Sequence, residues 1–325
     1  MDILADQLAR ARARGGVFSV LRRVRPWGLE FSGRRPLTAH VLIEGEGWLE
    51  QPGGDPVRVG ARDVVLMTAG SPYAIVSDPG TAVEPIADAR RRGSDTAPGD
   101  EATILCGAYV LDGSVAASLL GTLPRAIVVR EPDQDPSHAA AIALLAEQIR
   151  RDAPGQQTLL DRLLDLNLVF ALRAWWARAG DEAPGWYRAL SEPGLRHVLE
   201  QVHSDPGADW TVPAMADLAG MSRAAFAAHF RQVTGEPPGA YVTNVRMQRA
   251  EDELARSDAP LAKIATAVGY RNEYAFATAF RRHHSVSPGR WRTQARQPRR
   301  SEGREEGDHR QKDPERDASQ AEPCG

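Results

Sequence analysis

Residues 261–282 read LAKIATAVGYRNEYAFATAFRR, and residues 212–231 read VPAMADLAGMSRAAFAAHFR. Each stretch holds a short apolar helix, a glycine for a tight turn (Gly220 or Gly269) and a second amphipathic helix. This is the pattern of a helix-turn-helix, whose second helix enters the major groove of DNA. Two copies in one chain predict a protein that contacts two successive grooves.

The start of each helix carries a residue suited to cap it, because short polar side chains accept hydrogen bonds from free N–H groups. The predicted caps are Thr211, Ser222 and Asn272. Each second helix has two phenylalanines four residues apart, which places them on one buried face. The residues predicted to pack inside are Met215, Leu218, Ala219, Phe226, Phe230, Ile264, Ala265, Val268, Phe276 and Phe280. Residues 239–257 are predicted to form one long helix that holds the two units at a fixed separation.

The remaining positions of the two second helices are expected to face DNA. In the first unit they are Ser222, Arg223, Ala224, Ala227, Ala228 and Arg231; in the second they are Arg271, Asn272, Glu273, Tyr274, Ala277, Thr278 and Arg281. The alternative is a plain helical bundle that uses these segments only for packing. Two copies that share a turn glycine, a cap and the phase of a Phe-x-x-x-Phe-Arg pattern favour the DNA-binding interpretation.

The segment that holds both helical pairs, roughly the last hundred folded residues, resembles the DNA-binding domain of the AraC/XylS family of bacterial transcription regulators. The residues that carry the resemblance are Ile264, Ala265, Val268, Gly269, Tyr270, Phe276, Phe280, Arg281, Arg282, Ser287, Pro288, Trp291 and Arg292. The resemblance implies base contacts from Ala224, Ala227, Ala228, Glu273, Tyr274 and Thr278. Ala228 and Thr278 are small where an arginine is common, and Ser285 replaces a usual glycine. We therefore expect Arg223, Arg231, Arg271 and Arg281 to contact mainly phosphates, which position a protein without specifying sequence.

From Val17 to Tyr109 short apolar runs alternate with Gly and Pro clusters, which favours a β-barrel or sandwich. The polar stretch 88–101 is predicted to be a mobile loop. The region resembles the cupin-type sensor domain of one branch of the same family, through residues 40–45, Trp48, 63–66, 70–73 and 106–109. The predicted fold is thus α+β: a cupin-like barrel with a helical dimerisation region, followed by an all-α domain of two helix-turn-helix units.

Three barrel residues are candidates for sensing: His40, Tyr73 and Cys106. A metal-binding cupin needs several clustered histidines with a glutamate, whereas His40 stands alone and Tyr73 occupies a position where the branch often has histidine. No metal or other cofactor is therefore expected. Cys106 is interpreted as a buried apolar cysteine rather than a redox sensor, because only Cys324 in the polar tail could resolve it. The N-terminal barrel is expected to modulate DNA binding through a small, unidentified effector held in its mouth or through a redox signal.

Residues 138–151 and 157–179 show helical spacing of apolar residues, and the second has more apolar surface than one buried side needs. It either joins a homodimer interface or is simply buried in its own domain; both remain open. The expected domains are 1–185 for sensing and dimerisation, 191–294 for DNA binding and 297–325 as a disordered charged tail. Residues 1–16 are interpreted as an amphipathic helix.

The composition and charge of the chain argue against a membrane or secreted protein. The chain has 325 residues and a net charge of −3, with no apolar run long enough to cross a membrane and no secretion signal. A cytoplasmic bacterial transcription factor is predicted, with promoter DNA and RNA polymerase as partners and no membrane association. Two alternatives are a cupin enzyme with an accessory helical domain, which would need a metal cluster, and a ligand- or partner-binding protein without DNA activity. No catalytic arrangement points to an enzyme.

Overall fold

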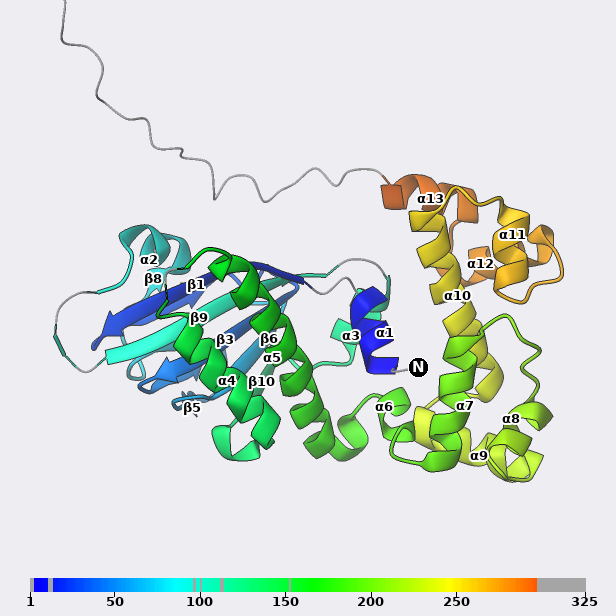
Figure 1. Ribbon diagram of the computed structural model, residues 1–325, viewed down its shortest axis with the longest axis horizontal. Helices are drawn as coiled ribbons and strands as arrows, with labels where there is room; N and C mark the ends of the chain where they lie inside the picture. The colour runs from blue at the N-terminus through cyan, green and yellow to red at the C-terminus, as the bar shows by residue number, and fades with distance from the viewer. Residues whose placement is uncertain are drawn as a thin grey trace, which may run out of the picture.

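The computed structural model describes residues 3–10, 14–95, 98–99, 101–111, 114–151 and 153–296. A strand-rich N-terminal part is followed by a helical C-terminal part, so the chain is α+β (Figure 1). The predicted disordered tail and Cys324 lie outside the described residues. Within the described residues, no helix is long and apolar enough to cross a membrane.

Two five-stranded sheets form the N-terminal part, with orders β1-β9-β3-β6-β10 and β5-β4-β7-β2-β8. Paired strands run antiparallel except β2 and β8, which are parallel. The strands are β1 Arg14–Val24, β2 Gly28–Phe31, β3 Leu37–Glu44, β4 Gly47–Glu50, β5 Val57–Val59, β6 Val64–Thr68, β7 Tyr73–Val76, β8 Glu84–Pro85, β9 Glu101–Val110 and β10 Ala126–Val129.

Strand β3 is buried on both faces, and its alternating side chains divide the core into two layers. Val41 and Ile43 join a cluster with residues of α4 and α5, while Leu42 joins a cluster built from both sheets. His40 lies on the same side of the strand as Leu42 because side chains two residues apart share a face. The N-terminal part therefore stacks helices, one sheet and the other sheet in layers.

Helices cover the outer face of the first sheet, where α4 and α5 lie across it (Figure 1). The helical segments of this part are α1 Ile3–Arg10, α2 Ile86–Arg92, α3 Ser114–Gly121, α4 Pro136–Gln148, α5 Gln156–Ala179 and α6 Gly185–Ala189, with short 3-10 turns at Glu131–Asp133 and Gly180–Glu182. On α5, Leu163 and Leu172 are buried, whereas Leu159 and Leu166 are exposed. The expected surplus of apolar surface on this helix is confirmed, and what covers it stays a prediction.

The prediction of a loop over residues 88–101 is wrong for its first part, because residues 88–92 belong to α2. Arg91 and Asp88 form an i,i+3 ion pair on this helix, and the carbonyl of Ala89 accepts a hydrogen bond from the buried Arg23 on β1 at 3.0 Å. Contacts distant in sequence thus stabilise a helix that its polar composition does not predict.

Helix α1 contacts both parts of the chain. Leu4 joins the cluster of α4 and α5, while Ile3 is buried among residues of the C-terminal part. Asp6 lies 3.6 Å from His203 on α7. The expected N-terminal helix over residues 1–16 is shorter than predicted, because β1 begins at Arg14.

The C-terminal part contains α7 Pro193–Ser204, α8 Val212–Leu218, α9 Arg223–Thr234, α10 Pro238–Arg256, α11 Leu261–Ala267, α12 Glu273–His284 and α13 Pro288–Arg296. Figure 1 shows α8 and α9 near one end of α10, and α11, α12 and α13 near the other. Each group has its own apolar cluster, and α10 contributes Val245 to one and Leu254 to the other. The long helix predicted for residues 239–257 is confirmed within one residue at each end.

Candidate functional site

The two helical pairs begin and end as their sequences predict. Ser222 and Asn272 accept hydrogen bonds from N–H groups of Ala225 and Ala275, at 3.3 and 2.9 Å, and so cap α9 and α12. Thr211 caps α8 in the same way at 3.3 Å. These bonds satisfy N–H groups that a helix start leaves without an intrahelical partner.

Both turns use a glycine with a positive φ, 66° at Gly220 and 76° at Gly269. After each glycine, an N–H bonds back five residues, from Met221 to Ala216 at 2.9 Å and from Tyr270 to Ala265 at 2.8 Å. This is the Schellman arrangement that ends many helices. The second turn is one residue longer, since residues 268–272 replace 219–222 between the helices. Arg271 is the additional, exposed residue.

On α9 the phenylalanines face inward and small residues face outward. Phe226 and Phe230 are fully buried. Of the residues predicted to face DNA, Ser222, Arg223, Ala224, Ala228 and Arg231 are exposed, and Ala227 is half-buried. The outer face of α9 therefore carries only small side chains between Arg223 and Arg231. Leu218, which was expected in the core, is 40% exposed instead.

Helix α12 offers a face with larger side chains. Arg271, Asn272, Tyr274, Thr278 and Arg281 are exposed, while Glu273 and Ala277 are half-buried. Tyr274 is 77% exposed, the highest value among the large apolar side chains of the described residues. A shallow depression is lined by Tyr274, Ala275, Thr278, Ala279 and Arg282. Arg282 was not among the predicted DNA-facing residues, although its spacing of four from Thr278 and eight from Tyr274 could have identified it.

The exposed face of α12 rests on a firmly packed support. Phe276 and Phe280 are fully buried, and Phe280 packs edge-to-face on Trp291 of α13 with ring centroids 5.9 Å apart. Arg246 of α10 donates hydrogen bonds to the carbonyls of Pro206 and Ala208, each at 2.8 Å. The bonds from Arg246 hold the loop between α7 and α8 against α10, whereas Phe276 and Phe280 pack in one apolar cluster with Met247, Ala250 and Leu254 of α10.

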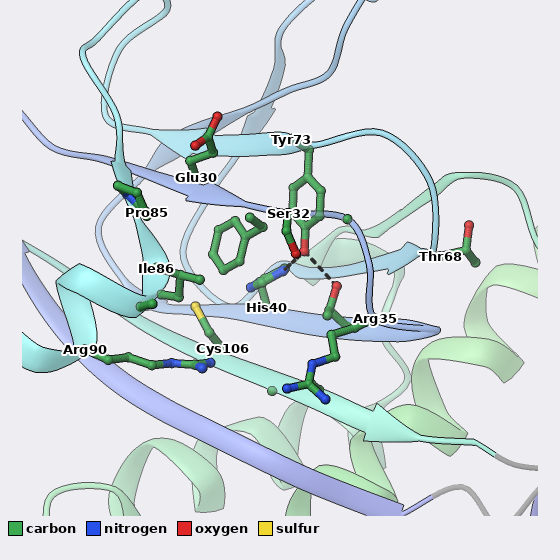
Figure 2. Close-up of a pocket in the computed structure, with 16 residues that line it drawn as sticks. Glu30, Ser32, Arg35, His40, Thr68, Tyr73, Pro85, Ile86, Arg90 and Cys106 are labelled. Atoms are coloured by element: carbon green, nitrogen blue, oxygen red, sulfur yellow. Dashed lines mark hydrogen bonds between the residues drawn. The ribbon is translucent and has the colours of Figure 1, made fainter. Parts of the chain in front are cut away.

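A second site is a cavity of about 170 Å³ in the strand-rich part, shown in Figure 2. It brings together the three predicted sensing residues, His40, Tyr73 and Cys106. The Tyr73 hydroxyl lies 2.7 Å from both the His40 Nε2 and the Thr38 Oγ1. The lining comprises Glu30, Phe31, Ser32, Gly33, Arg35, Thr38, His40, Thr68, Tyr73, Pro85, Ile86, Ala87, Arg90, Cys106, Gly107 and Ala108.

Burial controls the chemistry of these groups. Burial, aided by the nearby Arg90, lowers the pKa of His40 to about 3, so its imidazole is neutral at pH 7. Burial also raises the pKa of the Cys106 thiol to about 12. Because the thiolate is the reactive form of cysteine, these values favour the interpretation of Cys106 as an inert apolar cysteine. Among the residues that the structure describes, no cluster of His, Cys, Asp and Glu has the arrangement of a metal site.

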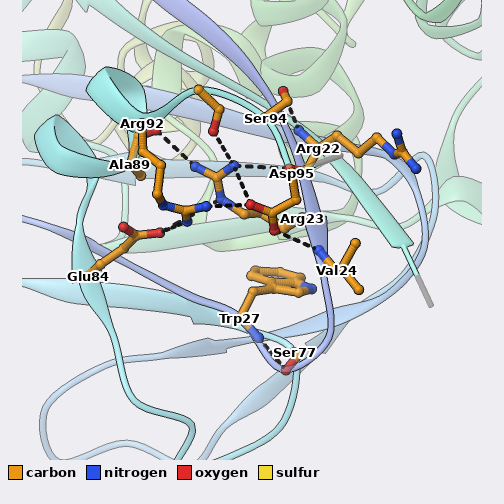
Figure 3. A network of polar contacts seen from close by, with 11 residues as sticks. Arg22, Arg23, Val24, Trp27, Ser77, Glu84, Ala89, Arg92, Ser94 and Asp95 are labelled. Carbon is orange, nitrogen blue, oxygen red and sulfur yellow. Dashed lines mark hydrogen bonds and ion pairs between the residues drawn. The ribbon is translucent and has the colours of Figure 1, made fainter. Parts of the chain in front are cut away.

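Helix α2 forms one side of this cavity through Ile86, Ala87 and Arg90. Figure 3 shows how the buried Arg23 secures its end: the guanidinium donates to the carbonyls of Ala89 at 3.0 Å and Gly93 at 2.7 Å. Asp95 accepts a hydrogen bond from the Val24 N–H at 3.0 Å, and Arg92 pairs with Glu84 and Asp95. A cationic side chain at the C-terminal end of a helix stabilises its unpaired carbonyls.

Comparison with known proteins agrees with this architecture. A cupin family model matches residues 2–177, and a helix-turn-helix domain model matches residues 215–294. An AraC-like transcription regulator of Streptomyces lividans is 31% identical over 307 residues, which cover 92% of this chain and 100% of that protein. The chain belongs to the AraC-type transcription regulators.

Other AraC-type relatives span most of the chain as well. The RCS-specific HTH-type transcriptional activator RclR of Escherichia coli strain K12 is 30% identical over 261 residues, covering 79% of this chain and 84% of that protein. Among solved structures, the DNA-binding domain of AdpA in complex with a target DNA is 28% identical, covers 32% of this chain and 94% of that chain, and has a TM-score of 0.31. The curated relatives named here are all transcription regulators.

Proposed function

We propose that this regulator reads its promoter with two recognition helices, α9 and α12, which enter successive major grooves on one face of the DNA. The observation that carries the proposal is the presence of two capped helices with exposed outer faces, joined by the single helix α10. With 19 residues, α10 is about 28 Å long at 1.5 Å per residue. That length is close to the roughly 34 Å between successive major grooves on one face.

The two helices have different parts in this proposal. Tyr274, Thr278 and Arg282 lie on the exposed face of α12 and contact base edges, with Glu273 at its N-terminal start. Ala224, Ala227 and Ala228 allow α9 to approach the bases closely but offer no side-chain hydrogen bonds. Sequence preference therefore comes mainly from the second unit. Ser222 and Asn272 cap their helices at the groove edge.

Phosphate contacts come from the arginines that flank these faces: Arg223, Arg231, Arg271 and Arg281. The side chains of all four are exposed, and within the described residues none of them forms an ion pair with a carboxylate. Such cations release condensed counterions from DNA on binding. They would explain DNA binding by a chain whose overall charge is slightly negative, because local placement matters more than net charge.

The N-terminal residues 1–185 act as a sensor in this proposal, and residues 191–294 bind DNA. The two sheets form a cupin-type barrel whose cavity receives a small effector, and the exposed apolar residues of α4 and α5, among them Leu144, Leu159 and Leu166, form the surface of a homodimer. RNA polymerase would be the partner at the promoter. The inert thiol of Cys106 favours a bound ligand over oxidation as the signal.

The test is binding of the full chain to DNA upstream of its own coding region at several salt concentrations. One arginine is neutralised in each helix, Arg231→Gln and Arg281→Gln, and Arg162→Gln on α5 is the control with the same charge change. Each helix variant should lower the magnitude of the slope of log K against log salt by about 0.9, and the double variant by about 1.8. The control should keep the original slope. If only one helix variant changes the slope, the two-helix proposal is wrong.

A further inference from the structure

The cavity beneath α2 has the size of a single ring. Its volume is about 170 Å³, and an apolar cavity of about 150 Å³ accommodates benzene. Phe31, Ile86 and Cys106 supply apolar walls, and Phe31 stacks on Tyr73 with ring centroids 5.0 Å apart. The occupant that these walls favour is a small organic molecule with one ring or a short aliphatic chain.

Two arginine side chains line this cavity, and neither has an acidic partner in the described part of the chain. Arg90 reaches it from α2 and Arg35 from the loop before β3; Figure 2 shows their guanidinium groups pointing toward one another. The Arg90 Nε donates to the Ser19 Oγ at 3.0 Å, which orients the guanidinium and leaves its terminal nitrogens available. By contrast, the neighbouring Arg92 is paired with two carboxylates.

The acidic residue at the rim does not neutralise these cations. Leu29 and Phe31 are both buried in the cluster between the sheets, so alternation along β2 directs Glu30 to the opposite face. Glu30 is exposed, and Figure 2 shows its carboxylate turned away from His40. The interior of the cavity therefore favours a negative charge.

A buried nitrogen of His40 also lies at the cavity. His40 is 1% exposed and lines the cavity, and its Nδ1 has no hydrogen-bond partner among the residues that the structure describes. Figure 2 shows this nitrogen on the side of the ring that faces Ile86 and Cys106. The Thr38 hydroxyl lies closer to the Tyr73 hydroxyl, at 2.7 Å, than to the carbonyl of Met67, at 3.4 Å, and we assign it as the donor to Tyr73. Tyr73 then donates to Nε2, and the imidazole proton resides on Nδ1. A buried donor left unsatisfied is costly, so this N–H provides a place for an acceptor.

We propose that this cavity binds a small carboxylate with an apolar body of single-ring size. The carboxylate accepts hydrogen bonds from Arg90, Arg35 and the His40 Nδ1, while its body lies against Phe31, Ile86 and Cys106. This inference rests on the proposed function only for the role of the ligand as effector, because binding itself needs no DNA.

The same contacts would couple ligand binding in the cavity to the stability of α2. Arg90 and Ile86 both lie on this helix, so a ligand held by Arg90 ties α2 to β3. The far end of α2 is already secured by Arg23. Binding should therefore slow amide hydrogen exchange over residues 86–92, since additional contacts lower the frequency of local opening.

The probe is sodium benzoate, with benzamide as its uncharged counterpart and hexanoate as an aliphatic carboxylate, titrated calorimetrically into the full chain without DNA. We expect saturable binding of at least one of the two carboxylates and binding of benzamide at least about tenfold weaker than benzoate, a ratio that corresponds to 1.4 kcal/mol. Arg90→Gln and Arg35→Gln should each weaken carboxylate binding by about tenfold. The adjacent variants Arg91→Gln and Arg34→Gln change the same charge outside the lining and should bind as the original chain does.

Three results would overturn the inference: neither carboxylate binds saturably, benzamide binds as well as benzoate, or the control variants lose as much affinity as the lining variants. Thermal unfolding without ligand shows whether each variant is folded. If Arg90→Gln is destabilised, Arg90→Lys replaces it as the test, because it keeps the positive charge and should recover part of the carboxylate binding. A chain that binds benzoate but no promoter DNA would contradict the proposed function alone. A chain that binds promoter DNA but neither carboxylate would contradict this inference alone.

Discussion

Lowering the pH from 7.5 to 5 should destabilise the strand-rich part through His40. The imidazole has a pKa of about 3 in the folded protein because it is buried and lies near Arg90, against about 6.5 in an unfolded chain. The unfolded chain therefore binds a proton at this site below pH 6.5, whereas the folded chain does so only near pH 3. The stability contributed by the neutral imidazole is complete above pH 6.5 and is lost as the pH falls from 6.5 toward 3.

The size of this loss follows from the separation of the two pKa values. Each pH unit within the window costs about 1.36 kcal/mol, and pH 5 lies about 1.5 units below 6.5. The free energy of unfolding should thus fall by about 2 kcal/mol between pH 7.5 and pH 5 through His40 alone. Other groups, such as the buried His138 with its lowered pKa, add to the total, so the measurement must isolate His40.

The assay compares the original chain with His40→Gln, whose amide can still bond to Tyr73, and with His197→Gln on the exposed surface of α7. Urea unfolding is followed by hydrogen exchange in peptides from β3 and β9, because a chain with more than one core need not unfold in one step. Between pH 7.5 and pH 5, the free energy of unfolding of the His40→Gln variant should fall by about 2 kcal/mol less than that of the original chain or of the His197→Gln variant. Parallel pH dependences for all three would refute the assignment of a neutral, buried His40.

Three further predictions concern the helical part and the surface of α5. Asn272→Ala removes the cap of α12 and should lower the free energy of unfolding of the second unit by about 1 kcal/mol, as measured by urea-dependent hydrogen exchange; an unchanged value would contradict the role of the cap. Phe280→Ala empties a fully buried position and should cost about 3–5 kcal/mol; DNA binding measured by gel shift should weaken strongly, and full binding would show that the second unit is dispensable. Leu166→Glu places a charge on the exposed apolar face of α5 and should shift light-scattering mass toward the monomer if this face forms the dimer, whereas Arg162→Gln nearby should not.

Local chemistry explains why the helical pairs could be predicted from sequence. A cap such as Ser222 and a glycine such as Gly220 act on neighbouring backbone groups, so their effects need no knowledge of the tertiary structure. The spacing of Phe276 and Phe280 likewise reports a buried face directly. The family resemblance then added the expected DNA contacts, which local chemistry alone cannot assign, and these stay a prediction.

The features that the sequence did not predict depend on distant residues. Helix α2 is stabilised by Arg23, which precedes its first residue by more than sixty positions and whose complete burial contradicts the usual exposure of arginine. The exposure of Leu218 depends on how α8 lies against its neighbours. The cavity around His40 was expected only in general terms, because its shape requires the loop before β3, β7 and α2 to converge.

The most direct test of the central claim, that α9 and α12 enter successive major grooves, is a hydroxyl-radical footprint of the full chain on a bound promoter fragment. We predict two protected patches on one face of the DNA for each bound chain, with centres about 10–10.5 base pairs apart. Arg281→Gln should weaken one patch and Arg231→Gln the other. A single patch per chain, or two patches that both variants weaken equally, would contradict the account.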